Sequence, residues 1–269
     1  VYVPVTHWVW GGGILSSWGT MDFAGGIVVH ATAGTAALVT ALTLGKRRGF
    51  PKSITPPHSP ILTMIGASML WIGWFGFNAG SALGANGGAG MAMLVTHISA
   101  ATASLVWMFI EWRRFGKPSL IGIVTGMVAG LATVTPASGY IGVPGGLVLG
   151  FFGGLFCYLA VDYIRGKLQI DDSLDVFAVH GVGGILGTLL VAFLATSTFS
   201  GLGLAEGQTA VSQFFVQLKA VVLTVVWTSV FTYLILKITS FIVPLRVDEQ
   251  EEIEGLDLRS HGEKGYHSD

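Results

Sequence analysis

The sequence predicts an all-α polytopic membrane protein. Of its 269 residues, 52% are hydrophobic and only 11% are charged, whereas soluble domains carry about 25% charged residues. Apolar runs of about 20 residues, the length that an α-helix needs to cross the hydrocarbon core, recur along the chain. The 39 glycines are typical of transmembrane helices that pack closely through small side chains. The net charge of −1 gives no reason to expect a nucleic-acid partner, and membrane lipid is the expected surrounding.

Seven apolar segments predict membrane spans, and the stretch at 1–15 has the composition of the end of a preceding helix. The segment at 119–135 is short and rich in glycine, and it ends in the turn-like stretch TPASGY. We expect a transmembrane domain at 1–243 and a cytoplasmic tail at 244–269, which is either a solvated tail or a docking element for a partner. The predicted spans are 23–44, 61–83, 90–112, 119–135, 141–164, 175–196 and 213–243.

Basic residues predict the orientation of these spans. They follow the odd-numbered spans, while the loops at 84–89, 136–140 and 197–212 contain no Lys or Arg. The positive-inside rule therefore places the C-terminus in the cytoplasm, as expected for a multi-pass protein of the inner (plasma) membrane. The basic residues that follow odd-numbered spans are Lys46, Arg47, Arg48, Lys52, Arg113, Arg114, Lys117, Arg165, Lys167 and Arg246.

Two ionisable segments inside the predicted spans form an internal repeat. DFAGGIVVH at 22–30 and DSLDVFAVH at 172–180 each place an Asp eight residues before a His. Their spans run in opposite directions, which indicates an inverted repeat. Eight helical residues rise about 12 Å, so His30 and His180 both approach the middle of a core about 30 Å thick. The two imidazoles could hydrogen-bond each other and line one pore, or each could bond separately to a backbone carbonyl.

The acids of the repeat have a structural role that follows from their position. Asp22 and Asp172 are expected in the first turn of their helices, where a carboxylate caps free N–H groups and suits the helix dipole. Asp175 heads the same span as Asp172 and is also assigned a structural role. Asp22 lies on the predicted outer side, where its charge could also hold an arriving cation. No third ligand falls at the depth of the histidines, so we expect neither a metal nor a cofactor.

Aromatic residues form a second cluster at the predicted outer side. The stretch WIGWFGFNAGSA at 71–82 alternates aromatic residues with Gly and Ala, and Trp10 belongs to the same side. Indole rings and the hydroxyl of Ser81 could bind a small cation by cation–π attraction and hydrogen bonding. Phe77 lies one turn deeper and could plug a pore. The alternative is that these rings serve as interfacial anchors or packing residues.

Several of these stretches resemble the ammonium transporter family (Amt/Mep/Rh), in its bacterial Amt branch. They are HWVWGGGIL, DFAGGIVVH, GWFGFNAGSA, DVFAVHGVGG and the tail GLDLRSHGEKGY, which together extend from residue 7 to residue 266. The resemblance implies a homotrimer of eleven-helix protomers, each with its own narrow apolar pore. It implies that ammonium is recruited outside and deprotonated, and that ammonia passes a histidine pair, with the proton crossing too. In bacterial members a PII-family signalling protein binds the cytoplasmic face and the tail.

The resemblance also carries roles to single residues. Trp10 and Ser81 match positions of the recruitment site, and Asp22 matches the acid that supports it. Phe77 matches the lower phenylalanine of the gate, and Trp74 matches an aromatic residue that flanks the pore.

His30 and His180 match the twin histidines of the family. The sequence departs from the family at its front, where family chains begin with about four more helices. The N-terminal helices of the fold are therefore expected to be missing. We expect this chain alone to be a fragment, or half of a split protein, and not a working transporter.

Three other functional classes are alternatives to electrogenic transport. An ammonium sensor would use the same site but is expected to carry an appended signalling domain. An electroneutral NH3 gas channel of the Rh type would pass ammonia without a current. An intramembrane enzyme would need a nucleophile or a metal set near the histidines, and since the sequence offers neither, we expect no enzymatic activity.

Overall fold

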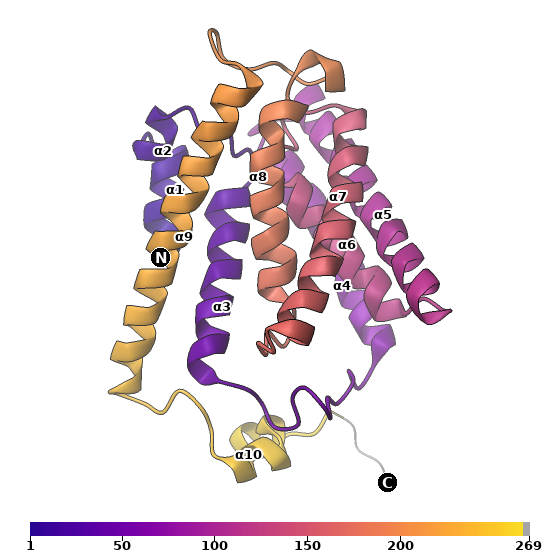
Figure 1. Cartoon of the computed structure of the whole chain (residues 1–269), viewed down its shortest axis with the longest axis vertical. Coiled ribbons are helices and arrows are strands. Elements are labelled where there is room, and N and C mark those ends of the chain that lie inside the picture. Colours follow the sequence, from indigo (N-terminus) through magenta and orange to yellow (C-terminus); the bar gives the residue numbers. More distant parts are fainter. Residues whose placement is uncertain (266–269) are drawn as a thin grey trace.

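The computed structural model describes residues 1–265, and all of the regular elements in that range are helical (Figure 1). The last four residues of the predicted tail, 266–269, lie outside the described residues. The α-helices are α1 (Tyr2–Trp10), α2 (Ile14–Ser17), α3 (Thr32–Leu44), α4 (Pro60–Gly80), α5 (Gly87–Phe115), α6 (Leu120–Val134), α7 (Val143–Val161), α8 (Val182–Leu194), α9 (Ala210–Ser240) and α10 (Glu249–Glu254). Shorter helical segments are η1 (Gly26–Ala31), η2 (Asp162–Lys167), η3 (Phe177–Gly181), η4 (Ser197–Phe199) and η5 (Asp257–His261).

Six helical segments of the described chain are long and apolar enough to cross a membrane. They coincide with six of the seven predicted spans. The remaining predicted span, 119–135, corresponds to α6, a 15-residue apolar helix that falls short of the usual spanning length of about 20 residues. The six segments are Gly26–Leu44, Pro60–Gly80, Gly87–Phe115, Val143–Lys167, Phe177–Leu194 and Ala210–Ser240.

Polar side chains define where most of the long helices begin. Ser59, Asn86, Ser119 and Thr209 are the N-caps of α4, α5, α6 and α9, and each side chain accepts a hydrogen bond from a backbone N–H of the first turn. At the other end of α5, Gly116 has a φ of 78°, the left-handed conformation that favours glycine and ends a helix.

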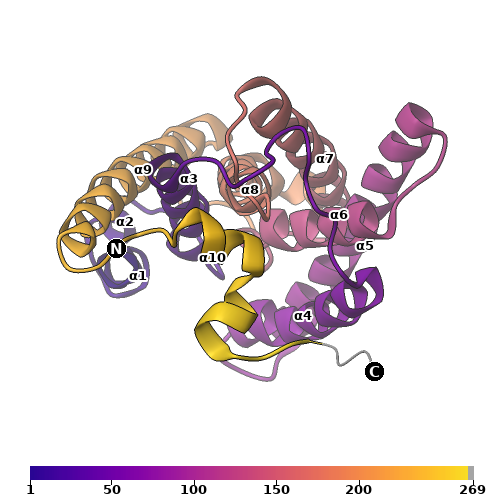
Figure 2. The same cartoon turned by 90° about the horizontal axis from the view of Figure 1, so that it is seen from below.

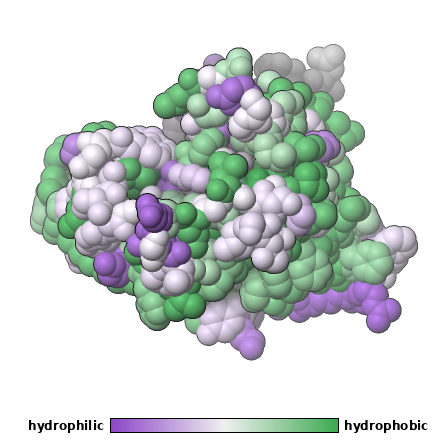
Figure 3. Space-filling view, turned by 90° about the horizontal axis from the view of Figure 1, so that it is seen from above, coloured by the Kyte–Doolittle hydropathy of each residue, from purple (hydrophilic) through white to green (hydrophobic). Residues whose placement is uncertain are grey.

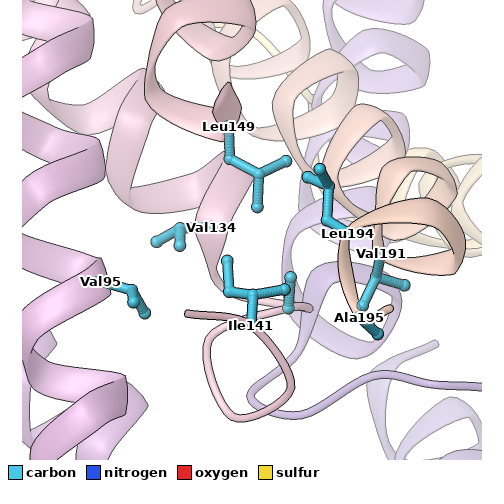
Figure 4. Packing of buried hydrophobic residues seen from close by; sticks show 8 residues of the cluster. Val95, Val134, Ile141, Leu149, Val191, Leu194 and Ala195 are labelled. Carbon is cyan, nitrogen blue, oxygen red and sulfur yellow. The ribbon is translucent and has the colours of Figure 1, made fainter. Parts of the chain in front are cut away.

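Helices α5, α6 and α7 form the most tightly packed part of the molecule. On α7, a side chain at Gly150 would come within 2.6 Å of the Ser99 carbonyl oxygen, and one at Gly154 would come within 2.8 Å of the Ala103 carbonyl oxygen. Glycines four residues apart thus let the two backbones approach, as in other membrane helix pairs. Above this contact, a cluster of aliphatic side chains from α5, α6, α7 and α8 fills the interior (Figure 4); it includes Val95, Val134, Leu149, Val191 and Leu194.

The two ends of the bundle differ in composition. The loop after α3, which carries Lys46, Arg47 and Arg48, lies at the lower end in Figure 1, together with α10. Seen from below, α10 lies across that end, near α3 and α8 (Figure 2). Seen from above, the opposite end has hydrophobic residues around most of its outline and hydrophilic residues in a few places (Figure 3). Lys219 places its Nζ 4.6 Å from the centre of the Trp18 ring.

The segments that carry the two histidines differ from the predicted regular α-helices. His30 lies in η1 and His180 lies in η3, and both segments are wound as π-helix. Each is followed by an α-helix of 13 residues, α3 or α8, and these two helices run in opposite directions (Figure 1). The assumption of eight helical residues between each Asp and its His is therefore wrong, because the helices begin after the acids and not at them.

Candidate functional site

Asp22 forms the start of the first histidine segment. It lies four residues before η1, and not in its first turn as expected. Its Oδ1 accepts hydrogen bonds from the N–H groups of Gly25 (2.9 Å) and Gly26 (2.6 Å), and its Oδ2 accepts from Ile27 (2.8 Å) and Val28 (3.1 Å). One buried carboxylate therefore satisfies four backbone donors that a helix start leaves free. The capping role predicted for Asp22 is confirmed, and its carboxylate is turned toward its own helix.

Of the acids before His180, Asp172 caps a backbone N–H, whereas Asp175 forms an ion pair. Asp172 Oδ2 accepts a hydrogen bond from the N–H of Phe177 at 2.7 Å. Asp175, at a φ of 55°, pairs with Arg165 at 3.0 Å between Oδ2 and Nη1. Burial raises the pKa of Asp175 to about 6, although the neighbouring Arg165 opposes the rise.

The sequence reasoning missed the acid at position 171. Asp171 Oδ2 accepts from the N–H of Arg47 at 2.8 Å, and its Oδ1 lies 3.2 Å from Arg47 Nε. This pair ties the loop before η3 to the loop after α3. Arg47 entered the prediction only as a topology signal, and its distance of 124 residues from Asp171 left no local pattern to find.

The two histidines meet in the interior. Nδ1 of His30 lies 3.2 Å from Nδ1 of His180, and the ring centres are 5.2 Å apart. One nitrogen of this contact must donate and the other must accept, so the tautomers of the two rings are linked. His30 is 2% exposed, and its Nε2 is a buried atom with no hydrogen-bond partner among the described residues. The contact between the rings confirms the predicted pairing over two separate backbone bonds.

Glycines allow the histidine segments to approach each other. The Cα of Gly34 on α3 packs directly on the backbone of Gly181 in η3. A Cβ at Gly184 would lie 2.5 Å from the Cβ of His30 and 2.8 Å from the carbonyl oxygen of Gly26. These positions tolerate no side chain unless the histidines move, since real Cβ contacts of that length do not occur.

Trp74 and Phe77 of α4 lie beside the pair. The Trp74 ring is stacked on His30 at 5.3 Å and 17° between planes, and on His180 at 6.3 Å and 16°. Its Nε1 donates to Thr135 Oγ1 at 2.9 Å, which fixes the indole. The Phe77 ring lies 6.2 Å from His30 and 5.8 Å from Trp74.

These rings line an open groove of about 680 Å³ whose remaining wall is aliphatic or glycine. The two histidines and Trp74 Nε1 are the polar ring groups among its lining residues, and Trp74 Nε1 is already bonded. A small neutral molecule with both donor and acceptor capacity could bond to the imidazoles here, whereas a bare ion would lose its hydration without replacement. The lining residues are Val29, His30, Ala33, Gly66, Met69, Leu70, Gly73, Trp74, Phe77, Val176 and His180.

Trp10 and Ser81 are partly exposed, and each has a local partner. Trp10 Nε1 donates to the backbone carbonyl of Asp22 at 2.8 Å, and Ser81 Oγ donates to the carbonyl of Phe77 at 2.9 Å. Within the described residues no hydrogen bond or ring contact joins Trp10 to Ser81 or Phe77. The structure therefore links Trp10 to Asp22 and Ser81 to Phe77, and it does not by itself form the predicted vestibule from both pairs.

The other ionisable residues of the spans lie apart from the pair. His97 is exposed on α5, where it stacks on Trp71 at 5.1 Å, and Glu111 accepts from the N–H of Ser119 at 2.7 Å. Among residues 1–265, no group of three or more His, Cys, Asp or Glu side chains is arranged to hold a metal ion.

Sequence comparisons place these features in a known group of proteins. The model of the Ammonium Transporter Family matches residues 1–266. The ammonium transporter Amt1 of Archaeoglobus fulgidus is 49% identical, over 99% of this chain and 67% of its own length. An ammonium transporter of Aquifex aeolicus is 46% identical, over 99% of this chain and 62% of its own length. An ammonium transporter of Bacillus subtilis is 42% identical, over 99% of this chain and 66% of its own length.

Solved structures agree with the sequence comparisons. A sensor Amt protein superposes with a TM-score of 0.89 at 30% identity, over 97% of this chain and 66% of its own. The crystal structure of Mep2 from Saccharomyces cerevisiae superposes with a TM-score of 0.82 at 35% identity, over 93% of this chain and 60% of its own. The chain thus spans about two thirds of the length of the relatives that it matches.

Proposed function

Because this chain belongs to the ammonium transporter family and has the Amt/Mep fold, we propose that it carries the conduction path by which ammonium crosses a membrane as ammonia. The family is one of membrane transporters and not of enzymes, as the sequence predicts. The proposed activity, substrate and partners are those of the full-length protein, of which this chain would form the conduction path.

One observation carries the proposal, namely the buried contact between His30 and His180 in an otherwise apolar groove. A buried polar nitrogen without a partner costs free energy, and His30 Nε2 has none among the described residues, so the pair keeps unused hydrogen-bonding capacity beside the groove. Ammonia has a lone pair and three N–H groups, and it can accept from one imidazole while donating to the other.

The chemistry of the groove supports deprotonation before passage. Moving a bare cation into low-dielectric surroundings costs far more than apolar walls return. Neutral ammonia avoids that cost, whereas potassium and sodium have no neutral form. In this proposal NH4⁺ dissociates to NH3 and H⁺ at the outer side, the linked tautomers of His30 and His180 relay the proton, and the two recombine inside.

The aromatic residues support a recruitment step at the outer side. Trp10 offers an exposed indole face for cation–π attraction, and Ser81 offers a hydroxyl. Phe77 lies between Ser81 and the histidines along α4 and would act as the gate, with Trp74 flanking the pore. Asp22 contributes by holding Trp10 through its carbonyl and by starting η1, so its role is to position these groups.

Cell location and partners follow from the charge pattern and the family. We place the protein in the plasma membrane as a multi-pass protein, with the basic loops and the tail at 244–269 in the cytoplasm. A homotrimer would cover apolar surfaces such as α4, which is exposed along most of its length. A PII-family protein would meet the basic end, where α10 and the loop after α3 lie together.

The test is the current that an ammonium pulse evokes in proteoliposomes containing the full-length protein. Wild type, His30→Ala and His180→Ala are compared with His97→Ala, which removes an exposed imidazole outside the groove. We expect the first two substitutions to abolish the current or its selectivity over potassium, and the third to leave both intact. Unchanged current and selectivity in His30→Ala and His180→Ala would overturn the relay. Ammonia uptake without any current in wild type would instead indicate the electroneutral channel.

A further inference from the structure

The loop between α2 and η1 positions the Trp10 indole, which belongs to the proposed recruitment site, and the start of η1. Within this loop, Asp22 holds the Trp10 indole through its carbonyl oxygen and caps the start of η1 through its carboxylate. The preceding residue, Met21, has no hydrogen bond to a neighbouring turn of its own segment in the described structure. Its backbone is held instead from the other end of the sequence.

Gln217 of α9 holds Met21 at two points. Its Oε1 accepts from the Met21 N–H at 2.9 Å, and its Nε2 donates to the Met21 carbonyl at 2.7 Å. The second N–H of the same amide donates to the carbonyl of Thr188 on α8 at 2.9 Å. Gln217 is fully buried, and 196 residues separate it from Met21.

The amide of Gln217 fits this position in one orientation. Both of its donors meet carbonyl oxygens, and its oxygen meets the N–H of Met21 and the Nε2 of Gln213, the latter at 3.2 Å. A flipped amide would set donors against donors. Gln213 extends the network by donating to the carbonyl of Gly19 at 3.0 Å. All polar atoms of the Gln217 side chain are thus used on the loop or its support, as a buried amide requires.

We propose that Gln217 is a positioning residue for substrate recruitment: by pinning Met21 it sets where Asp22 begins η1 and where its carbonyl holds the Trp10 indole. This inference rests on the proposed transport function and deepens it. Trp10 is 46% exposed, and its one polar atom bonds only to this loop. A shift of the loop therefore moves the indole, whereas the contact between His30 and His180 is also held by packing at Gly34 and Gly184.

The test is the ammonium dependence of the current for the full-length protein in proteoliposomes. Gln217→Met keeps the length of the side chain and removes the amide. We expect the half-saturating ammonium concentration to rise about fivefold, the equivalent of about one hydrogen bond, while the maximal current changes less than about twofold. Adding Gln217→Met to Trp10→Phe should raise the half-saturating ammonium concentration no further, because both substitutions act on the same indole.

Thr224→Val is the matched control on the same buried face of α9. The Thr224 hydroxyl is buried without a hydrogen-bond partner among the described residues, so this variant should keep the wild-type half-saturation. If Gln217→Met does not assemble, Gln213→Met tests the same network through Gly19. We then expect the half-saturating ammonium concentration to rise about twofold. The inference is overturned if the assembled variant keeps wild-type half-saturation, loses only maximal current, or adds its effect to that of Trp10→Phe. Absence of ammonium current in wild type would overturn the transport function, and the inference with it.

Discussion

Replacing Asp22 by Asn tests how the first histidine segment is built. The carboxylate gives each of its oxygens to two backbone N–H groups, at 2.6–3.1 Å. An Asn side chain has one oxygen, so two of the four N–H groups would face an NH2 group instead. A buried donor left without a partner costs about 1–3 kcal/mol, and we therefore expect a loss of about 2–6 kcal/mol in the free energy of unfolding.

Asp172→Asn is the matched control in the second half of the repeat. Within residues 1–265 the Asp172 side chain accepts only from the N–H of Phe177, and the oxygen of Asn can keep that bond. The expected loss is below about 1.5 kcal/mol, the net value of one hydrogen bond. The two variants are compared by chemical unfolding in mixed micelles and by hydrogen exchange at the amides of Ile27 and Val28. Equal stability losses in the two variants, or unchanged protection of those amides in Asp22→Asn, would refute the four-bond cap.

Three further predictions follow from the site and the tail. Gly184→Ala should displace His30 and cost about 1–3 kcal/mol of stability together with most of the ammonium current. Gly166→Ala, where nothing lies within 4 Å of an added Cβ, should change neither stability nor current. A fully active Gly184→Ala protein would contradict the close packing of Gly184 on His30. Since burial raises the pKa of Asp175 to about 6, the folded state holds the proton of this carboxyl more tightly than the unfolded state, so the free energy of unfolding should fall by up to about 3 kcal/mol as pH rises from 4 to 6. Asp175→Asn should flatten that part of the pH profile of stability. An identical profile in both proteins would contradict the raised pKa of Asp175. The Glu252 carboxylate accepts from the Arg48 N–H at 2.7 Å and from Arg246 at 2.6 Å, so Glu252→Gln should increase protease cleavage of the tail with little change in global stability, and an unchanged cleavage rate would argue against this attachment.

The parts of the fold that depend on local pattern were predictable. Apolar length and the distribution of Lys and Arg are read along the chain, and they predicted six of the spans at the positions observed. The repeated spacing of Asp and His on opposed helices made a contact between His30 and His180 one of two alternatives, and the structure shows that contact.

The parts that depend on contacts between distant segments were not predictable. Neither Asp171 with Arg47 nor Gln217 with Met21 has a local signature, because each pair is joined across more than a hundred residues. The partner of Trp10 Nε1, the backbone carbonyl of Asp22, leaves no trace in the residue types.

The central claim is that the pore passes a molecule that can lose its charge. The most direct measurement is the current carried by potassium relative to ammonium, at equal concentrations, by the full-length protein in proteoliposomes. The two ions are similar in size, but only ammonium can give up a proton. The account predicts a clear ammonium current with no potassium current above that of empty vesicles. A potassium current comparable to the ammonium current would contradict it.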